Sequence, residues 1–231
     1  DHYCICGAPE MFTVTFMNGD EVWITDNRYY NTKIAYVGMN YPTKEGYSFS
    51  GWYTAEGDPI ANGTLVMGDM VVYAGFRINT YNYTVEVYTM DLFGNYGEPV
   101  VTAEAAEFGS IVDLTGYQTG EHFYLDGENI NSKLYATVPA NDDLVMRVYV
   151  VRKTYDITWI LNGCTVVTEI VSDLPTSLRY SGDLGEYGWH YINMLLDTPA
   201  GYRVVDYVDG NGNSIAKESY NGHDRLKFPV T

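Results

Sequence analysis

The sequence has few cysteines, few basic residues and no long apolar run. Its three cysteines, Cys4, Cys6 and Cys164, cannot form a framework of bridges, which excludes a small extracellular protein held together by disulfides. No stretch approaches the roughly 18 to 20 apolar residues that a membrane span requires, so we expect no membrane insertion. The fold must depend on apolar cores, and 46% of the residues are hydrophobic.

The shortage of basic residues sets the charge of the chain. There are 13 lysine and arginine residues against 30 aspartate and glutamate residues, which gives a net charge of −17. A field of that sign repels phosphate backbones and anionic membrane surfaces. We therefore expect no nucleic-acid partner.

The first residues, DHYCICGAPE, have neither an initiator methionine nor the basic and apolar segments of a signal peptide. We expect residues 1–11 to be the remnant of a preceding module in a longer polypeptide. An alternative is half of a zinc site, formed by His2, Cys4 and Cys6 and completed by ligands upstream. A structural zinc site needs four ligands and usually has its paired cysteines two to four residues apart, so we expect no cofactor in this chain itself.

Strands of one kind recur along the chain at a nearly constant interval. Aromatic and β-branched residues alternate in three segments that begin 71 and 72 residues apart, namely residues 12–16, 83–87 and 155–159. Each unit closes on a comparable apolar strand, at residues 70–76, 144–150 and 225–230. A fixed period of this length indicates an array of similar modules.

The period predicts a mainly β (α+β) fold of tandem small modules. The expected division is a remnant at 1–11 followed by modules at 12–79, 80–153 and 154–231. The segments that connect the modules are only a few residues long and contain no Pro, Gly or Ser tract, which favours close coupling of neighbours. We therefore expect an elongated array.

Turn residues predict a hairpin at the start of two modules. Asn18-Gly19-Asp20 and Asn162-Gly163 are such turns, because Asn and Gly tolerate the positive φ of hairpin loops. The second hairpin would join residues 157–161 to residues 165–170. The variable middles, at 26–40 and 176–198, have room for one or two helical turns but contain glycines that break any long helix.

The segment GYSFSGWY, residues 46–53, is the densest aromatic stretch of the first module. Its alternation predicts a half-buried strand with Trp52 packed in the core. Gly46 and Gly51 mark positions where φ is positive or where a side chain does not fit.

Three stretches of the first module, FTVTFMNGDEV, PTKEGYSFSGWYT and GDMVVYAGF, resemble the Listeria-Bacteroides repeat, also called the internalin B-repeat. Gly75-Phe76 stands where that family commonly ends in tryptophan. The second module, from TYNYTVEVYTMDLFGNYGEPV to LVMRVYVVRKTYDITW, resembles the related mucin-binding-protein-like repeats, although Tyr149, Val150 and Arg152 only approximate their closing strand. The third module keeps a trace of both families in GYRVVDYVD.

The resemblance implies β-grasp-like modules, each a small mixed sheet crossed by a short helix or loop. It also implies a secreted or cell-wall-attached protein of bacteria, in which such repeats act as spacers, adhesive modules or partner-binding arms. The family has no catalytic residues to carry over to this chain. We therefore expect an extracellular or cell-surface location and no enzyme activity.

The residues that catalyse reactions or bind metals in other proteins form no clear constellation here. Four histidines, His2, His122, His190 and His223, show no pairing with a nucleophile, and Cys164 reads as a partly buried structural cysteine. Residues 209, 211 and 213 imitate the start of a calcium loop, but the sixth and twelfth positions are Ser214 and Tyr220 instead of the required Gly and Glu. A hairpin turn is the simpler interpretation of that loop.

Aromatic residues supply the candidate binding sites. The chain has 23 tyrosines and four tryptophans, and a ring with a polar edge suits the recognition of sugars and proteins. Those in the variable middles are the candidates, because recognition residues concentrate in irregular segments. They are Tyr29, Tyr30, Tyr36, Tyr187, Trp189 and Tyr191.

Three functions stay open at this point. The first is a spacer or interaction segment, whose partners are flanking modules of the same polypeptide. The second is an adhesin that binds a protein or glycan of a host or a neighbouring cell through its aromatic loops. The third is an accessory region of an extracellular enzyme.

Overall fold

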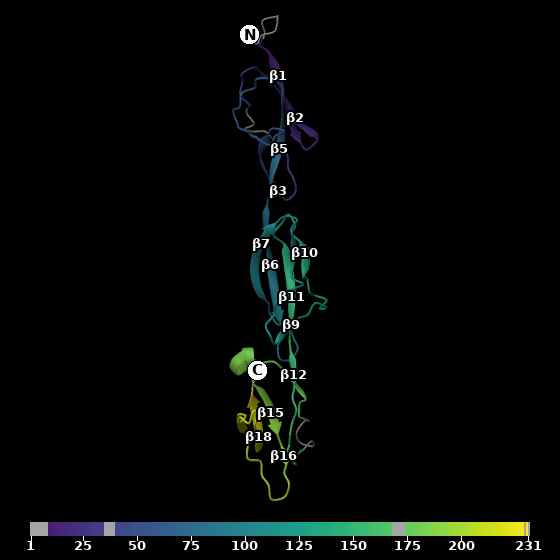
Figure 1. Cartoon of the computed structure of the whole chain (residues 1–231), viewed down its shortest axis with the longest axis vertical. Coiled ribbons are helices and arrows are strands. Elements are labelled where there is room, and N and C mark those ends of the chain that lie inside the picture. Colours follow the sequence, from purple (N-terminus) through teal and green to yellow (C-terminus); the bar gives the residue numbers. More distant parts are fainter. Residues whose placement is uncertain (1–8, 35–39, 168–173, 229, 231) are drawn as a thin grey trace. The chain divides into compact units, whose positions relative to one another are not determined.

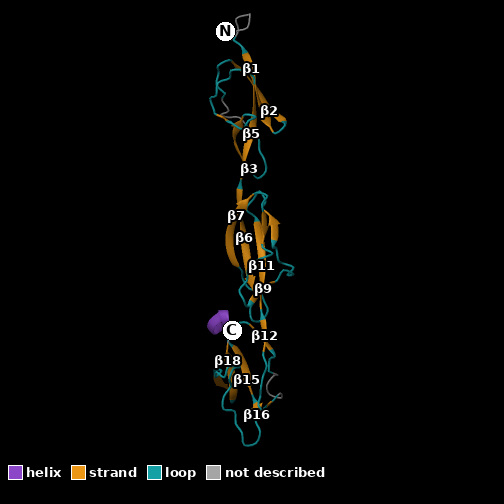
Figure 2. Ribbon diagram, viewed as in Figure 1, coloured by secondary structure: helices purple, strands orange, loops and turns teal. Residues whose placement is uncertain are grey.

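Nearly all of the regular secondary structure in the described residues is β-strand, as expected (Figure 1, Figure 2). The computed structural model describes residues 9–34, 40–167, 174–228 and 230. Its strands are β1 Met11–Asn18, β2 Glu21–Tyr29, β3 Tyr47–Tyr53, β4 Pro59–Ile60, β5 Met70–Ile78, β6 Thr80–Thr89, β7 Val100–Glu107, β8 Ile111–Asp113, β9 Phe123–Leu125, β10 Tyr135–Thr137, β11 Leu144–Arg152, β12 Thr154–Asp156, β13 Thr165–Val166, β14 Ser177–Arg179, β15 His190–Met194, β16 Leu196–Asp197, β17 Lys217–Tyr220 and β18 His223–Phe228.

Among the described residues, helix is limited to one short 3₁₀ segment, η1 Gly182–Gly188, drawn in purple in Figure 2. It lies in the variable middle at 176–198, where helical turns were predicted, and Gly185, with a φ of 53°, interrupts it. The other predicted middle differs, since β2 continues to Tyr29 and its described residues contain no helix. Within the described part of the chain, no helix has the length and apolar character needed to cross a membrane.

The chain divides into two compact units. The first consists of Asp1–Thr84, Ala103–Val112 and Tyr135–Val145, and the second of Val85–Thr102, Asp113–Leu134 and Met146–Thr231. The expected division into modules at 12–79, 80–153 and 154–231 stays a prediction.

A five-stranded sheet with the order β2-β1-β5-β3-β4 follows the N-terminal residues. The hairpin of β1 and β2 turns at Gly19-Asp20, where Gly19 has a φ of 63°, so the first predicted hairpin is confirmed. Strands β1 and β5 are parallel and pair Val14 with Met70, while β3 is antiparallel to β5. This is the mixed sheet expected of the first module.

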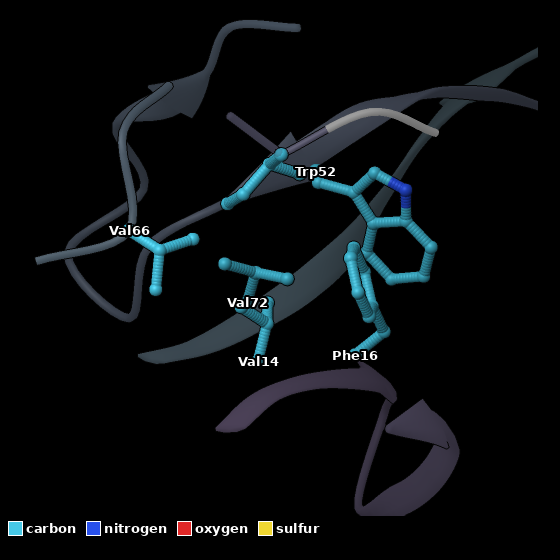
Figure 3. Close-up of a cluster of buried hydrophobic side chains, with 6 residues drawn as sticks. Val14, Phe16, Trp52, Val66 and Val72 are labelled. Atoms are coloured by element: carbon cyan, nitrogen blue, oxygen red, sulfur yellow. The ribbon is translucent and has the colours of Figure 1, made fainter. Parts of the chain in front are cut away.

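The core of this sheet is formed by inward-facing side chains of β1, β3 and β5. Val14, Phe16, Trp52 and Val72 are each about 1% exposed, and Figure 3 shows the Trp52 ring beside that of Phe16. The two ring centroids are 4.8 Å apart in an edge-on arrangement, a geometry that aromatic pairs favour. The prediction that Trp52 is buried is therefore confirmed.

The next strands along the chain form a four-stranded sheet with the order β7-β6-β11-β9. Strands β8 and β10, which lie between β7 and β11 in the sequence, form a separate two-stranded sheet. Strand β11 is the most buried strand of the four-stranded sheet, since six of its nine residues are buried. It contains the closing strand predicted at 144–150 and extends it to Arg152.

The C-terminal part has three smaller sheets, β12-β14, β13-β16 and β15-β18-β17. Ile192, Met194 and Leu226 form its core, and Trp159 packs against them. Figure 1 shows β15 and β18 next to each other in this part, and they pair in antiparallel register.

The second predicted hairpin is wrong in part. Its turn is present, because Asn162 and Gly163 have φ angles of 44° and 87° and the Cys164 amide donates to the Leu161 carbonyl over 2.8 Å. Residues 157–161 form no strand, however, and β13 pairs with β16. The reason is tertiary packing, since the Ile157 amide donates to the Thr176 carbonyl and the Trp159 indole to the Pro175 carbonyl. Residues 168–170 lie outside the described residues.

Candidate functional site

A pocket of about 550 Å³ lies entirely within the second compact unit. It is lined by residues from the loop after β6, from β12 and β14, and from the start of β15. They are Leu92, Phe93, Thr154, Ser177, Leu178, Arg179, Trp189, His190 and Tyr191. Its size is within the range of roughly 300 to 1,000 Å³ that is usual for small-molecule sites.

The loop after β6 is shaped by Asp91. One carboxylate oxygen of Asp91 accepts hydrogen bonds from the amides of Phe93 at 2.8 Å and Asn95 at 2.7 Å. These hydrogen bonds lower the pKa of the Asp91 carboxyl, that to Asn95 most, because they stabilise its charged form. Gly94 completes the turn with a φ of 92°. The loop leaves the Phe93 side chain 85% exposed at the pocket.

Arg179 attaches that loop to strand β14. Its Nη1 donates to the Leu92 carbonyl over 2.9 Å, although the two residues are 87 positions apart. Strand β14 is itself held by antiparallel pairing with β12, which places Arg179 opposite Thr154. The guanidinium therefore lies on a fixed element, with further N–H groups beyond the one that Leu92 uses.

Two cations lie over the aromatic rings of this region. The Lys227 Nζ is 4.6 Å from the centroid of the Trp189 ring, and the Arg225 Cζ is 4.6 Å from that of Tyr191. Both distances are within the range of an attractive cation–π contact. Strand pairing produces this arrangement, because Tyr191 of β15 is opposite Lys227 of β18.

The polar atoms of Trp189 and His190 add hydrogen-bonding capacity. The Trp189 Nε1 is buried and has no hydrogen-bond partner among the described residues. The His190 Nε2 lies 3.0 Å from the Arg179 carbonyl oxygen, which only accepts, so Nε2 carries the hydrogen and Nδ1 is left as an acceptor. Burial lowers the pKa of His190 below its ordinary 6.5, against a smaller opposing effect of that hydrogen bond.

A buried arginine holds the two sides of the pocket in place. Arg152 is 3% exposed and donates from Nε to the Met90 carbonyl and from Nη1 to the Tyr180 carbonyl, each over 3.0 Å. It also forms an ion pair with Asp183, in which Nη2 and Oδ2 are 3.1 Å apart. Met90 precedes the loop after β6 and Tyr180 follows β14, so this one side chain connects both.

The pocket contains two of the six predicted binding residues, Trp189 and Tyr191. Tyr187 lies in η1, but its side chain is outside the described residues, and Tyr36 is outside them entirely. Tyr29 and Tyr30 belong to the first compact unit at the end of β2. Tyr29 is 48% exposed, and the Tyr30 ring is 6.3 Å from that of Phe12.

Sequence reasoning missed Phe93 and Arg179. A signal for Phe93 was present, because the turn sequence Asp91-Leu92-Phe93-Gly94 has two apolar residues where a loop usually carries polar ones. Arg179 gave no comparable signal, since its role depends on contacts made in the folded state.

The turn predicted for the loop that begins at Asp209 is confirmed. One Asp209 oxygen accepts from the amides of Asn211 and Asn213, at 2.8 and 2.9 Å, and the other accepts from the Asn213 side chain at 3.0 Å. Within the ranges that the structure describes, no group of three His, Cys, Asp or Glu residues is placed to hold a metal ion. His2, Cys4 and Cys6 lie outside the described residues, so the zinc alternative stays open.

The comparison with protein families identifies the first sheet. Residues 12–75 match the Listeria-Bacteroides repeat domain. The matched residues contain β1 without its first residue, all of β2 to β4 and the first six residues of β5. Comparison with curated proteins found no match.

One similar solved structure is described as "Crystal structure of Mub-RV". It is 14% identical, and the alignment covers 61% of this chain and 97% of that one with a TM-score of 0.17. Such a score carries no argument about fold. The resemblance of the second and third modules to mucin-binding-protein-like repeats stays a prediction.

Proposed function

We propose that this chain is a non-enzymatic repeat segment of a bacterial surface protein, secreted or attached to the cell wall, and that it acts as a spacer. The observation that carries the proposal is the repeat-domain match at residues 12–75, which fold into a sheet with its own buried core. A module with its own core can be repeated in series, and arrays of such modules extend with each copy.

The two junctions between successive sheets support a stiff spacer. A single residue, Asn79, separates β5 from β6, and Lys153 alone separates β11 from β12. The Asn79 amide donates to the Gly46 carbonyl and the Asn79 carbonyl accepts from the Phe108 amide, both at 2.9 Å. Lys153 repeats the pattern, with its amide donating to His122 over 2.9 Å and its carbonyl accepting from Tyr180 over 2.8 Å. Backbone groups fixed on both sides leave a junction little freedom to bend.

A display experiment tests the spacer function. The chain is placed between a peptide tag and a wall anchor on an encapsulated bacterium, and antibody binding to the tag is measured. The control replaces the chain by a globular protein of the same length. The proposal predicts greater binding with this chain, because the tag extends farther from the wall. Equal binding in the two strains would argue against a spacer.

A second candidate function, adhesion to a glycan or protein, is favoured by the pocket. Trp189 and Tyr191 line it together with Phe93, which is 85% exposed, and such rings suit the binding of sugars and proteins. A glycan and mucin array compares the intact chain with Trp189→Ala. Binding that the substitution reduces supports adhesion, whereas no signal for the intact chain removes this candidate.

A further inference from the structure

We propose that the pocket binds an anionic sugar, one that carries a carboxylate or a sulfate group. The proposal rests on the second candidate function, adhesion, and specifies the class of ligand. The spacer function does not depend on it.

The charge of the pocket is opposite to that of the chain. The chain has 30 acidic residues, but none of the nine residues that line the pocket is acidic, while Arg179 is among them. Lys227 is close by, over the Trp189 ring. An anion is therefore attracted to this place on a protein whose overall field repels it.

Two of the nearby cations are free to bind an anion. Arg225 is engaged by Glu218, to which its Nε donates over 2.7 Å. No ion pair among the described residues includes Arg179 or Lys227. Arg179 donates one N–H to Leu92 and keeps others in the planar arrangement that suits carboxylate and sulfate oxygens.

The remaining groups fit a sugar ring. Trp189 and Tyr191 supply aromatic surface, and Thr154 and Ser177 supply hydroxyl groups. The Trp189 N–H is a buried donor without a partner, and the His190 Nδ1 is an acceptor. A sugar presents an apolar ring face and hydroxyl groups that both donate and accept, which suits the aromatic surface and the hydroxyl groups of the pocket.

The pocket is also preorganised for such a ligand. Arg152 fixes both the residue before the loop and the residue after β14, and Arg179 is held at Leu92. A site held on fixed elements loses less entropy on binding than a mobile one.

The test compares sugars that differ only in charge. Amide and indole resonances of the intact chain are followed by NMR during titration with methyl β-glucuronide and with the neutral methyl β-glucoside. Galactose 6-sulfate and galactose form the second pair, which shows whether a carboxylate or a sulfate is preferred. The proposal predicts at least about tenfold tighter binding of one charged sugar than of its neutral counterpart, equivalent to one bidentate charged contact.

Substitutions connect that preference to the pocket. Lys227→Gln, at a partly buried position of β18, is expected to weaken binding of the charged sugar about threefold or more and to leave the neutral sugar unchanged. Lys217→Gln is the matched control, because Lys217 is paired with Asp224 and lies over the ring of Tyr207, which is not among the residues that line the pocket, whereas Lys227 lies over Trp189, which is. Arg179→Gln removes the guanidinium and should weaken binding of the charged sugar more than Lys227→Gln does. If Arg179→Gln does not fold, the comparison of Lys227→Gln with the unsubstituted chain tests the proposal.

The outcomes distinguish a failure of the anionic-sugar proposal from a failure of adhesion through this pocket. Equal binding of charged and neutral sugars overturns the proposal and leaves adhesion standing. Binding of the acidic peptide Ac-Glu-Glu-NH₂ with no response to any sugar also overturns it, in favour of a protein partner. No response to any of these probes overturns both the proposal and adhesion through this pocket.

Discussion

The aromatic ring of Phe108 occupies the space that a Cβ atom at Gly46 would need. Gly46 also has a φ of 75°, an angle that other residues rarely adopt. The rings of Tyr47 and Tyr81 pack edge-on against Phe108, with centroids 6.1 and 6.4 Å away. Two features therefore require glycine at position 46: its positive φ, and the Phe108 ring at the junction between β5 and β6, which leaves no room for a side chain.

Replacing Gly46 by alanine tests this relationship. Gly109→Ala is the matched control, because Gly109 also has a φ of 75° but has nothing within 4 Å of a Cβ. We expect Gly109→Ala to lower the free energy of unfolding by ~1 kcal/mol from the backbone alone. Gly46→Ala adds the clash, for a total of ~2–4 kcal/mol. Chemical denaturation measures both, and equal losses would show that the ring moves aside without cost.

Trp52→Ala is expected to cost ~3–5 kcal/mol of unfolding free energy, because it empties the centre of a small core. Trp23 is the control, since it belongs to the same sheet but is 42% exposed, and its replacement should cost clearly less. Thermal unfolding of the two variants measures the difference. A Trp52→Ala variant that melts with the unsubstituted chain would contradict the packing in Figure 3.

Two arginines with different burial predict different losses on replacement by methionine. Arg152 is buried in its ion pair with Asp183, whereas the Arg147 side chain, paired with Glu86, is 43% exposed. We expect Arg152→Met to cost ~3–5 kcal/mol, since it leaves the Met90 and Tyr180 carbonyls without their donor. Arg147→Met should cost ~1 kcal/mol or less. Similar denaturation midpoints for the two variants would refute the role assigned to Arg152.

His190 predicts a dependence of stability on pH. Its pKa in the folded chain is below the 6.5 of the unfolded state, so the unfolded state takes up the proton first as the pH falls. The contribution of His190 is fully present above pH 6.5 and declines as the pH drops from there toward the folded pKa. His190→Gln should reduce the loss of unfolding free energy between about pH 7.5 and about pH 5.5. A variant with the same pH slope as the unsubstituted chain would show that His190 does not contribute.

Local rules predicted the first sheet well. The turn at Gly19-Asp20, the strand from Tyr47 to Tyr53 and the burial of Trp52 all follow from alternation and from glycine placement. Each depends on residues close together in sequence, and in this sheet tertiary packing agrees with the local preference.

Sequence reasoning failed where distant contacts decide the structure. Residues 157–161 have a strand pattern, yet their hydrogen bonds go to the segment around Pro175 and Thr176. Trp189 and Tyr191 were predicted from their place in a variable middle, and both line the pocket. Arg179 was not, because its partner Leu92 is 87 positions away. No local period encodes a separation of that kind.

The spacer claim is tested most directly by small-angle X-ray scattering of the intact chain. A compact single-core protein of 231 residues would have a radius of gyration of about 17 Å. A spacer of modules in series should have a value clearly above this, with the scattering curve of a folded, elongated particle. A radius of gyration near ~17 Å would contradict the account.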